Sequence, residues 1–192
     1  MLLGDIVQTA PTAQVLSVGD AKAHLHVLHQ EHDAYITGLI DEAIESFETE
    51  TGMCLASQTR EATFDDFPCE GEWIVLPRRP VASVTWVKYY DTAGVQQTLA
   101  STQNLLGAFE ARIVPPINTP WPSTQVGRAD RVTVRYVCGY ATPDAVPKDI
   151  IRAIKLMVGD AYENRGDDLK VRVGIPPAAQ RIIHMHAMGT PA

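Results

Sequence analysis

Cysteine is scarce in this 192-residue chain, and its arrangement does not indicate cross-linking. The three cysteines, Cys54, Cys69 and Cys138, are odd in number and lie far apart. This excludes a disulfide framework and a CxxC metal site, and it favours a reducing compartment. The first residues, MLLGDIVQ, lack the basic region and the long apolar core of a signal peptide, so we expect no export.

Long apolar runs and an excess of positive charge are also missing. The longest uncharged run, residues 92–109, is rich in Gln, Thr, Ser and Asn, which excludes a membrane span there. The chain has 16 Lys and Arg against 23 Asp and Glu, a net charge of -7. Nucleic-acid binding through overall charge works by neutralising phosphates, so this class of protein is excluded. The charge does not exclude DNA that passes close to the chain.

Catalytic signatures are absent too. The sequence contains no GxSxG, no glycine-rich phosphate loop and no HExxH. The carboxylate pairs Asp65-Asp66 and Asp167-Asp168 are adjacent in sequence, so they do not place two acids around one substrate atom. We therefore predict no enzyme, no cofactor and no metal site.

A cluster of histidines leaves one alternative open. Four of the six lie between His24 and His32. Two ligands on one helix need a spacing of three or four residues, and only His29 with His32 has it, across a predicted helix end. Solvated histidines are the favoured interpretation, and a metal-dependent hydrolase is the alternative.

Both ends of the chain have helical patterns. Ser17 followed by Asp20 resembles a capping box, which predicts a helix to about His29. Asp33 is a plausible N-cap for a second helix that Gly52 ends, with one apolar stripe (Ile36, Leu39, Ile40, Ala43, Ile44 and Phe47). A third helix follows Pro147 and ends near residue 165. Residues 1–56 contain one Lys and nine acidic residues, so the second helix presents an acidic solvent face.

The middle of the chain has the alternation of β-strands. The predicted strands are 58–64, 73–76, 81–90, 95–99, 111–114 and 131–138. Residues 115–128 contain four prolines and Trp121, which predicts a long loop. After residue 166 we expect a polar tether and then an apolar segment that contacts either its own body or another protein.

The order of these segments resembles the head-tail connector (adaptor) proteins of tailed bacteriophages and gene transfer agents. Residues 16–25, LSVGDAKAHL, are similar to the opening SLxEAKxHL of that family. Further similar segments are 33–40 with 50–52, 76–84 (LPRRPVASV), 121–122, 134–140 (VRYVCGY), 146–147 and 162–165 (YENR). The resemblance spans about residues 15–165.

This resemblance implies an α+β fold in which two N-terminal helices and one C-terminal helix form a helical body, with an antiparallel β lobe inserted. The expected parts are the N-terminal helices in residues 1–56, the β lobe in 57–140, the C-terminal helix in 141–166, and a tether with a docking arm in 167–192.

The implied function is structural: a dodecameric ring under the portal that extends the DNA channel and carries the stopper or tail. The implied partners are further copies of the chain, the portal, a stopper or tail-completion protein, and DNA that passes without sequence-specific binding. The implied location is the virion neck, after assembly in the host cytoplasm, with no membrane. Another neck or tail-completion protein is the nearest alternative.

Two sets of residues are candidate contact sites. The portal-docking candidates are Ile182, Ile183, Met185 and Met188 in the C-terminal arm. The channel or subunit-interface candidates are Glu45, Glu48, Arg78, Arg79 and Trp121. For the two arginines, the alternative is a turn with solvated side chains; for Trp121, it is an anchor within the β lobe.

Overall fold

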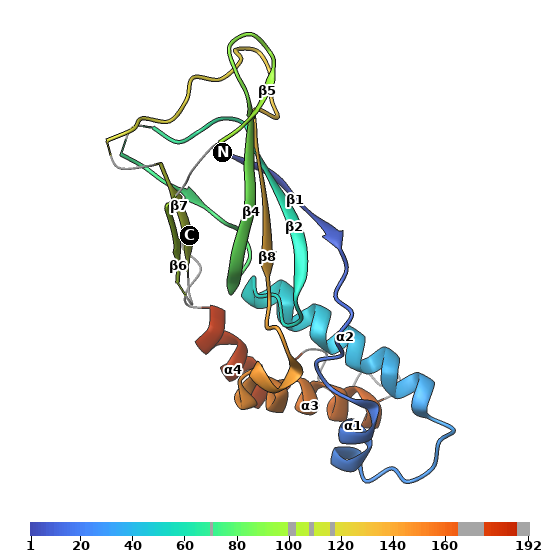
Figure 1. Cartoon of the computed structure of the whole chain (residues 1–192). Coiled ribbons are helices and arrows are strands. Elements are labelled where there is room, and N and C mark those ends of the chain that lie inside the picture. Colours follow the sequence, from blue (N-terminus) through green and yellow to red (C-terminus); the bar gives the residue numbers. More distant parts are fainter. Residues whose placement is uncertain (70, 100–102, 108–109, 116–117, 165–174, 188–192) are drawn as a thin grey trace. The chain divides into compact units, whose positions relative to one another are not determined.

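The chain forms two compact units, each built from two separate stretches of sequence. The computed structural model describes residues 1–69, 71–99, 103–107, 110–115, 118–164 and 175–187 (Figure 1). The β unit combines Met1–Thr12 with Ser57–Tyr140, and the helical unit combines Ala13–Ala56 with Ala141–Ala192. The predicted α+β class is confirmed.

Helices of the helical unit begin and end at the expected signals. They are α1 (Val18–Leu25), α2 (Asp33–Thr51), α3 (Lys148–Glu163) and α4 (Pro177–Ala187), with a 3-10 turn, η1, at Pro143–Ala145. The Ser17 hydroxyl accepts a hydrogen bond from the Asp20 amide at 3.0 Å, which caps α1. His26 ends α1 in the left-handed region, a few residues before the predicted end. Gly52, with φ 68°, ends α2 as predicted.

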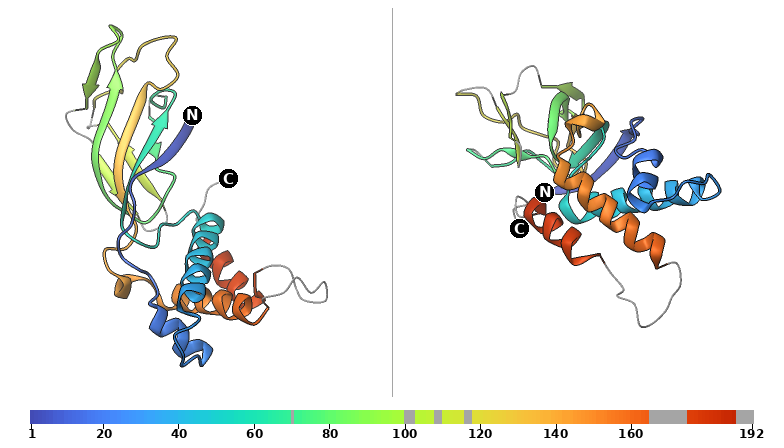
Figure 2. Two further views of the ribbon diagram at one scale, coloured as in Figure 1. Left: turned by 90° about the vertical axis from the view of Figure 1, so that its right-hand side faces the viewer. Right: turned by 90° about the horizontal axis from the view of Figure 1, so that it is seen from below.

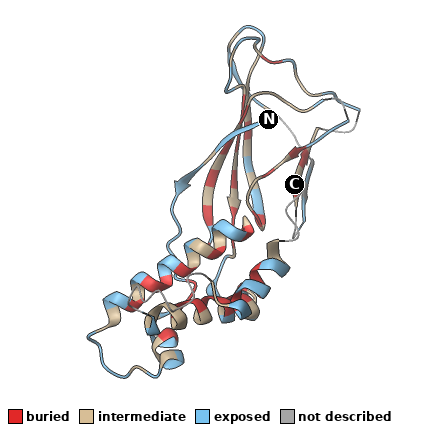
Figure 3. Ribbon diagram, turned by 180° about the vertical axis from the view of Figure 1, so that it is seen from behind, coloured by how far each residue is buried: buried red, intermediate tan, exposed pale blue. Residues whose placement is uncertain are grey.

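Apolar faces of three helices meet in the core of the helical unit. α2 packs on α3, and α4 packs on both. The buried side chains are Ile36, Leu39, Ile40, Ala43 and Phe47 from α2, Ile150, Ala153, Ile154, Met157 and Val158 from α3, and Ala179, Ile182 and Ile183 from α4 (Figure 3). The Nε2 atom of His186 also forms a hydrogen bond with a carboxylate oxygen of Asp149 at 2.8 Å. This bond joins α4 to the first turn of α3.

Antiparallel pairing organises the β unit. A five-stranded sheet has the order β1-β2-β8-β4-β5, and a three-stranded sheet has the order β3-β7-β6 (Figure 2). The strands are β1 (Leu2–Thr9), β2 (Gln58–Phe64), β3 (Ile74–Val75), β4 (Val81–Tyr90), β5 (Gln96–Thr98), β6 (Gln103–Leu106), β7 (Ala111–Val114) and β8 (Val132–Cys138). In β2 and β8 every second residue is buried, as the alternation predicted.

The N-terminal residues differ from the expectation. Residues 1–56 were assigned to the helical body, but residues 1–12 belong to the β unit and β1 pairs with β2. β1 has no alternating pattern, because its apolar residues form adjacent pairs and nearly all of them are exposed. Backbone pairing with β2 and the polar side chain of Asp5 hold the strand, and apolar packing contributes little.

The Asp5 carboxylate lies at the centre of a largely buried polar network. Its oxygens accept hydrogen bonds from Arg60 Nε at 2.7 Å and from the Tyr136 hydroxyl at 2.9 Å. Arg60 also donates from Nη2 to the Asp5 carbonyl at 3.2 Å. Burial and the nearby Asp5 charge raise the pKa of Tyr136, so its hydroxyl keeps the proton that it donates. Asp5 therefore links β1 to β2 and β8.

The C-terminal segment also differs from the expectation. A tether and a docking arm were predicted for residues 167–192; residues 167–174 lie outside the described residues. Within 175–187 the chain forms α4, which packs on its own unit. The apolar spacing of Ala179, Ile182 and Ile183 suits one helical face, and this explains why the segment folds back.

Replacing Asp5 with Ala should destabilise the β unit by about 3 kcal/mol, because Arg60 would keep a buried charge without its main partner. Unfolding in urea followed by tryptophan fluorescence measures this, since Trp73, Trp86 and Trp121 all lie in the β unit. Gln8→Ala is the control, because its side chain is exposed, bonds Glu61 and should contribute about 0.5 kcal/mol or less. Equal effects of the two substitutions would contradict the role of Asp5.

Candidate functional site

Arg78 and Arg79 lie inside the β unit rather than on a basic surface. Arg79 is 6% exposed, and burial lowers its pKa despite the opposing effect of Tyr140. Arg78 Nε lies 3.7 Å from the Asp5 carboxylate. Solvated side chains were one of the two predictions for this pair, and this one is wrong for Arg79, which is withdrawn from solvent. Contact of the two arginines with a neighbouring molecule stays a prediction.

Trp121 anchors the long loop that was predicted for residues 115–128. Its ring stacks on Phe67 with a centroid distance of 4.8 Å and an angle of 11°, and Phe67 contacts Tyr89 edge-on at 5.5 Å. The Trp121 indole donates to the Glu72 carbonyl at 3.1 Å. A cavity of about 330 Å³ beside this cluster is lined by prolines and the ion-paired Asp66 and Arg131. The loop surface is thus held by aromatic packing, with Trp121 half-buried.

Acidic side chains cover the solvent face of α2. Glu45 is exposed, together with Asp41, Glu42 and Glu50. Glu48 differs, because its carboxylate accepts a hydrogen bond from the Leu55 amide at 2.6 Å. Of the two predicted acidic candidates, Glu45 faces solvent and Glu48 stabilises the turn after α2.

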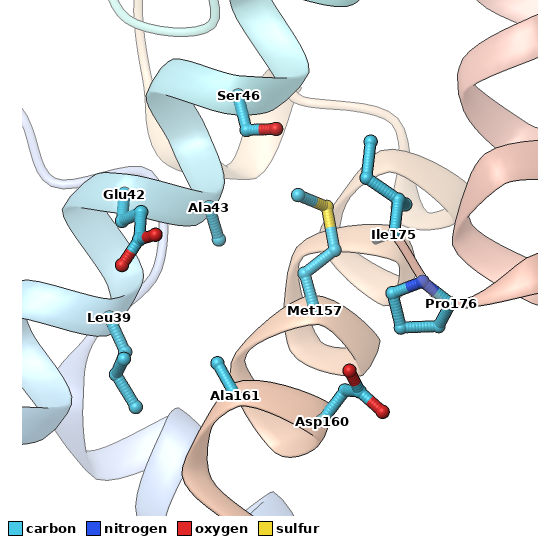
Figure 4. A pocket seen from close by; sticks show the side chains of 9 residues that line it. All are labelled: Leu39, Glu42, Ala43, Ser46, Met157, Asp160, Ala161, Ile175 and Pro176. Atoms are coloured by element: carbon cyan, nitrogen blue, oxygen red, sulfur yellow. The ribbon is translucent and has the colours of Figure 1, made fainter. Parts of the chain in front are cut away.

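An open groove of about 270 Å³ lies between α2 and α3 (Figure 4). Leu39, Ala43 and Met157 supply apolar surface, and Glu42 and Asp160 supply carboxylates. Ile175 and Pro176, just before α4, complete the lining. The groove adds apolar surface to the acidic face of the helical unit.

The four portal-docking candidates separate into three environments. Ile182 and Ile183 are 8% and 4% exposed and belong to the core of their own unit. Met185 is 51% exposed and remains on the surface. Met188 lies outside the described residues. Within the described residues the segment packs on its own unit, and docking on another protein through Met185 or Met188 stays a prediction.

Of the two outer strands of the five-stranded sheet, β5 was predicted as residues 95–99, whereas β1 was not predicted. In β1, Leu2, Leu3, Ile6 and Val7 are 39%, 49%, 58% and 46% exposed. In β5, at the opposite edge, all three residues are exposed. The two adjacent apolar pairs in residues 2–7 were the available signal, but they fit neither the helical nor the strand period.

The histidine cluster forms ring contacts. His29 and His32 meet edge-on at 4.5 Å, and His32 Nδ1 lies 2.7 Å from the Tyr162 hydroxyl. Among the residues that the structure describes, no three His, Cys, Asp or Glu side chains come together in a way that could hold a metal ion. Within the same residues, no helix has the length and apolar character needed to cross a membrane.

Three solved structures that are similar to this chain come from gene transfer agent (GTA) particles. The chain matches "Neck of empty GTA particle computed with C6 symmetry" at TM-score 0.79 and 23% identity, covering 96% of this chain and 95% of that one. It matches "Virion of native gene transfer agent (GTA) particle" at 0.79 and 25%, covering 95% and 94%. A third match, "Neck of native GTA particle computed with C12 symmetry", has TM-score 0.77, 24% identity and coverages of 96% and 94%.

The chain has the fold of a gene transfer agent neck protein. The resemblance that the sequence motifs predicted is confirmed, and it extends beyond residues 15–165 to nearly the whole chain. No protein-family model and no curated protein matches the sequence.

Within this neck fold, Ile183→Ala should destabilise the helical unit by about 2–4 kcal/mol, because it removes buried side-chain volume. Met185→Ala is the matched control on the same helix and should cost about 0.5 kcal/mol or less. Thermal unfolding followed by helical circular dichroism measures both. If the two variants unfold alike, α4 is not part of the core of its unit.

Proposed function

We propose that the chain is a structural protein of the neck of a phage-like particle, where it acts as a head-tail connector. One observation carries the proposal: the fold matches chains of gene transfer agent particles, two of them from structures of the neck, over 94–96% of both chains. The order of sequence motifs supports the same conclusion independently.

The chain forms a homo-oligomeric ring in this proposal. The similar neck structures carry the symmetry labels C6 and C12, which are both cyclic. A ring of identical subunits needs one surface on each copy that fits a different surface on the next copy. In this proposal the ring also lies between the portal and a stopper or tail-completion protein, and it extends the channel for DNA.

The acidic face of α2 suits a protein that DNA must pass without binding. Asp41, Glu42, Glu45 and Glu50 are exposed there, and the whole chain carries a net charge of -7. Carboxylates repel phosphates, and this repulsion lets a duplex slide. We assign Glu45 to this face and not Glu48, whose carboxylate is bound within the chain.

Neutralising the acidic face should change DNA retention. In particles that carry the combined variant Asp41→Asn, Glu42→Gln, Glu45→Gln and Glu50→Gln, we expect slower or incomplete DNA release, measured as nuclease-protected DNA after triggered ejection. Glu31→Gln, at an exposed acid outside α2, is the control. Normal filling, release and tail joining in the combined variant would show that the acids do not act on DNA.

Deleting the gene tests the proposed function as a whole. Producer cells without the chain should make heads that lack tails, counted by electron microscopy, and a plasmid copy should restore joined particles. Normal tailed particles in the deletion strain would contradict the proposal.

A binding assay then separates the connector from another neck or tail-completion protein. Purified portal should retain the connector, whereas a tail-completion protein should be retained by the tail tube. Retention by the tail tube alone would replace the connector assignment and leave the neck assignment unchanged.

A further inference from the structure

The five-stranded sheet of the β unit ends in two different exposed strands. β1 and β5 occupy the ends of the order β1-β2-β8-β4-β5. Every residue of β1 except Asp5 is exposed, and so is every residue of β5. An exposed strand edge presents backbone donors and acceptors to which a further strand can bind.

Exposed apolar side chains occur on both faces of β1. The register pairs Ile6 with Glu61 on one face and Val7 with Arg60 on the other. Ile6 and Val7 are 58% and 46% exposed, although each lies in a strand. A strand added beside β1 would cover apolar surface on both faces, which is the contact that stabilises neighbouring strands.

Neither edge carries the charges that usually prevent strand pairing. β1 contains no Lys, Arg or Pro, and the carboxylate of its one charged residue, Asp5, is bound within the β unit. β5 lies inside the uncharged run of residues 92–109. Two irregularities in β1, between Leu2 and Gly4 and between Val7 and Thr9, limit its regular part to residues 4–7. That length is close to the three residues of β5.

We infer that β1 of one copy pairs with β5 of the next copy, so that neighbouring five-stranded sheets join edge to edge around the neck ring. This inference rests on the proposed function. The contact joins two different surfaces, so it repeats identically from copy to copy, which is the kind of contact that a cyclic ring requires. Pairing of β1 with β1 would stop at a dimer. Val95, 54% exposed and next to β5, supplies an apolar partner for the β1 side chains.

Cross-linking between two variants tests this contact. One carries Ile6→Cys and the other Thr98→Cys, at positions that the register places on the same face of the sheet. Both also carry Cys69→Ser, because Cys69 is the exposed cysteine, whereas Cys54 and Cys138 are buried. Particles assembled from a mixture of the two variants are purified and treated with a flexible bismaleimide.

We expect a cross-linked dimer that contains one chain of each variant, and no dimer from either variant alone. The chain with both substitutions should give a ladder of oligomers. Failure of the mixed dimer to form in particles that contain the chain would overturn the inference, and so would efficient linking of Ile6→Cys to itself. In either case the neck function would stand, whereas particles that lack the chain would contradict the neck function itself.

A charge on the edge gives a second test. Ile6→Lys should lower the amount of chain retained in purified particles roughly tenfold or more, because it removes apolar contact and adds the charge that blocks edges. Leu28→Lys is the control, at a side chain 95% exposed between α1 and α2. Tryptophan fluorescence confirms that the β unit of the Ile6→Lys chain is folded. Retention equal to the control would overturn the inference.

Discussion

The buried ion pair between Asp5 and Arg60, together with the backbone pairing of β1 with β2, joins the two segments of the β unit. Its two segments, residues 1–12 and 57–140, are separated in sequence by the first two helices. The apolar residues of β1 are mostly exposed, so hydrophobic burial contributes little to holding the strand. The polar network of Asp5, Arg60 and Tyr136 takes the place of hydrophobic burial. This network fixes β1 in one position, because each hydrogen bond is directional.

Most of the fold could be predicted from the sequence, because most elements bury one face. The α2 stripe and the alternation in β2 and β8 are direct consequences of burial on one side. β1 could not be predicted by that route, since its position depends on the distant partners Arg60 and Tyr136. β6 was not predicted either, because it is short and lies in an uncharged run without alternation.

The candidate contact residues were harder to predict than the fold, because residue type does not reveal burial. Arg79 belongs to a charged class that is usually exposed, yet it is 6% exposed here. Glu48 looks like its neighbour Glu45, but a backbone amide seven residues further along binds its carboxylate. Ile182 and Ile183 look like a docking motif because the same apolar spacing serves contact within a chain and between chains.

The use of polar groups inside the β unit explains why its edges are neutral. Arg60 and Arg78 form ion pairs with Asp5, and Arg135 forms one with Glu61. These charges are therefore paired within the β unit. What remains at β1 and β5 is backbone and uncharged side chains. Screening by salt does not weaken contacts of that kind, whereas ion pairs between exposed charges weaken as ionic strength rises. In the proposed ring the two surfaces have different tasks: the neutral edges bind a further copy, and the carboxylates of α2 repel phosphate without competing for that contact.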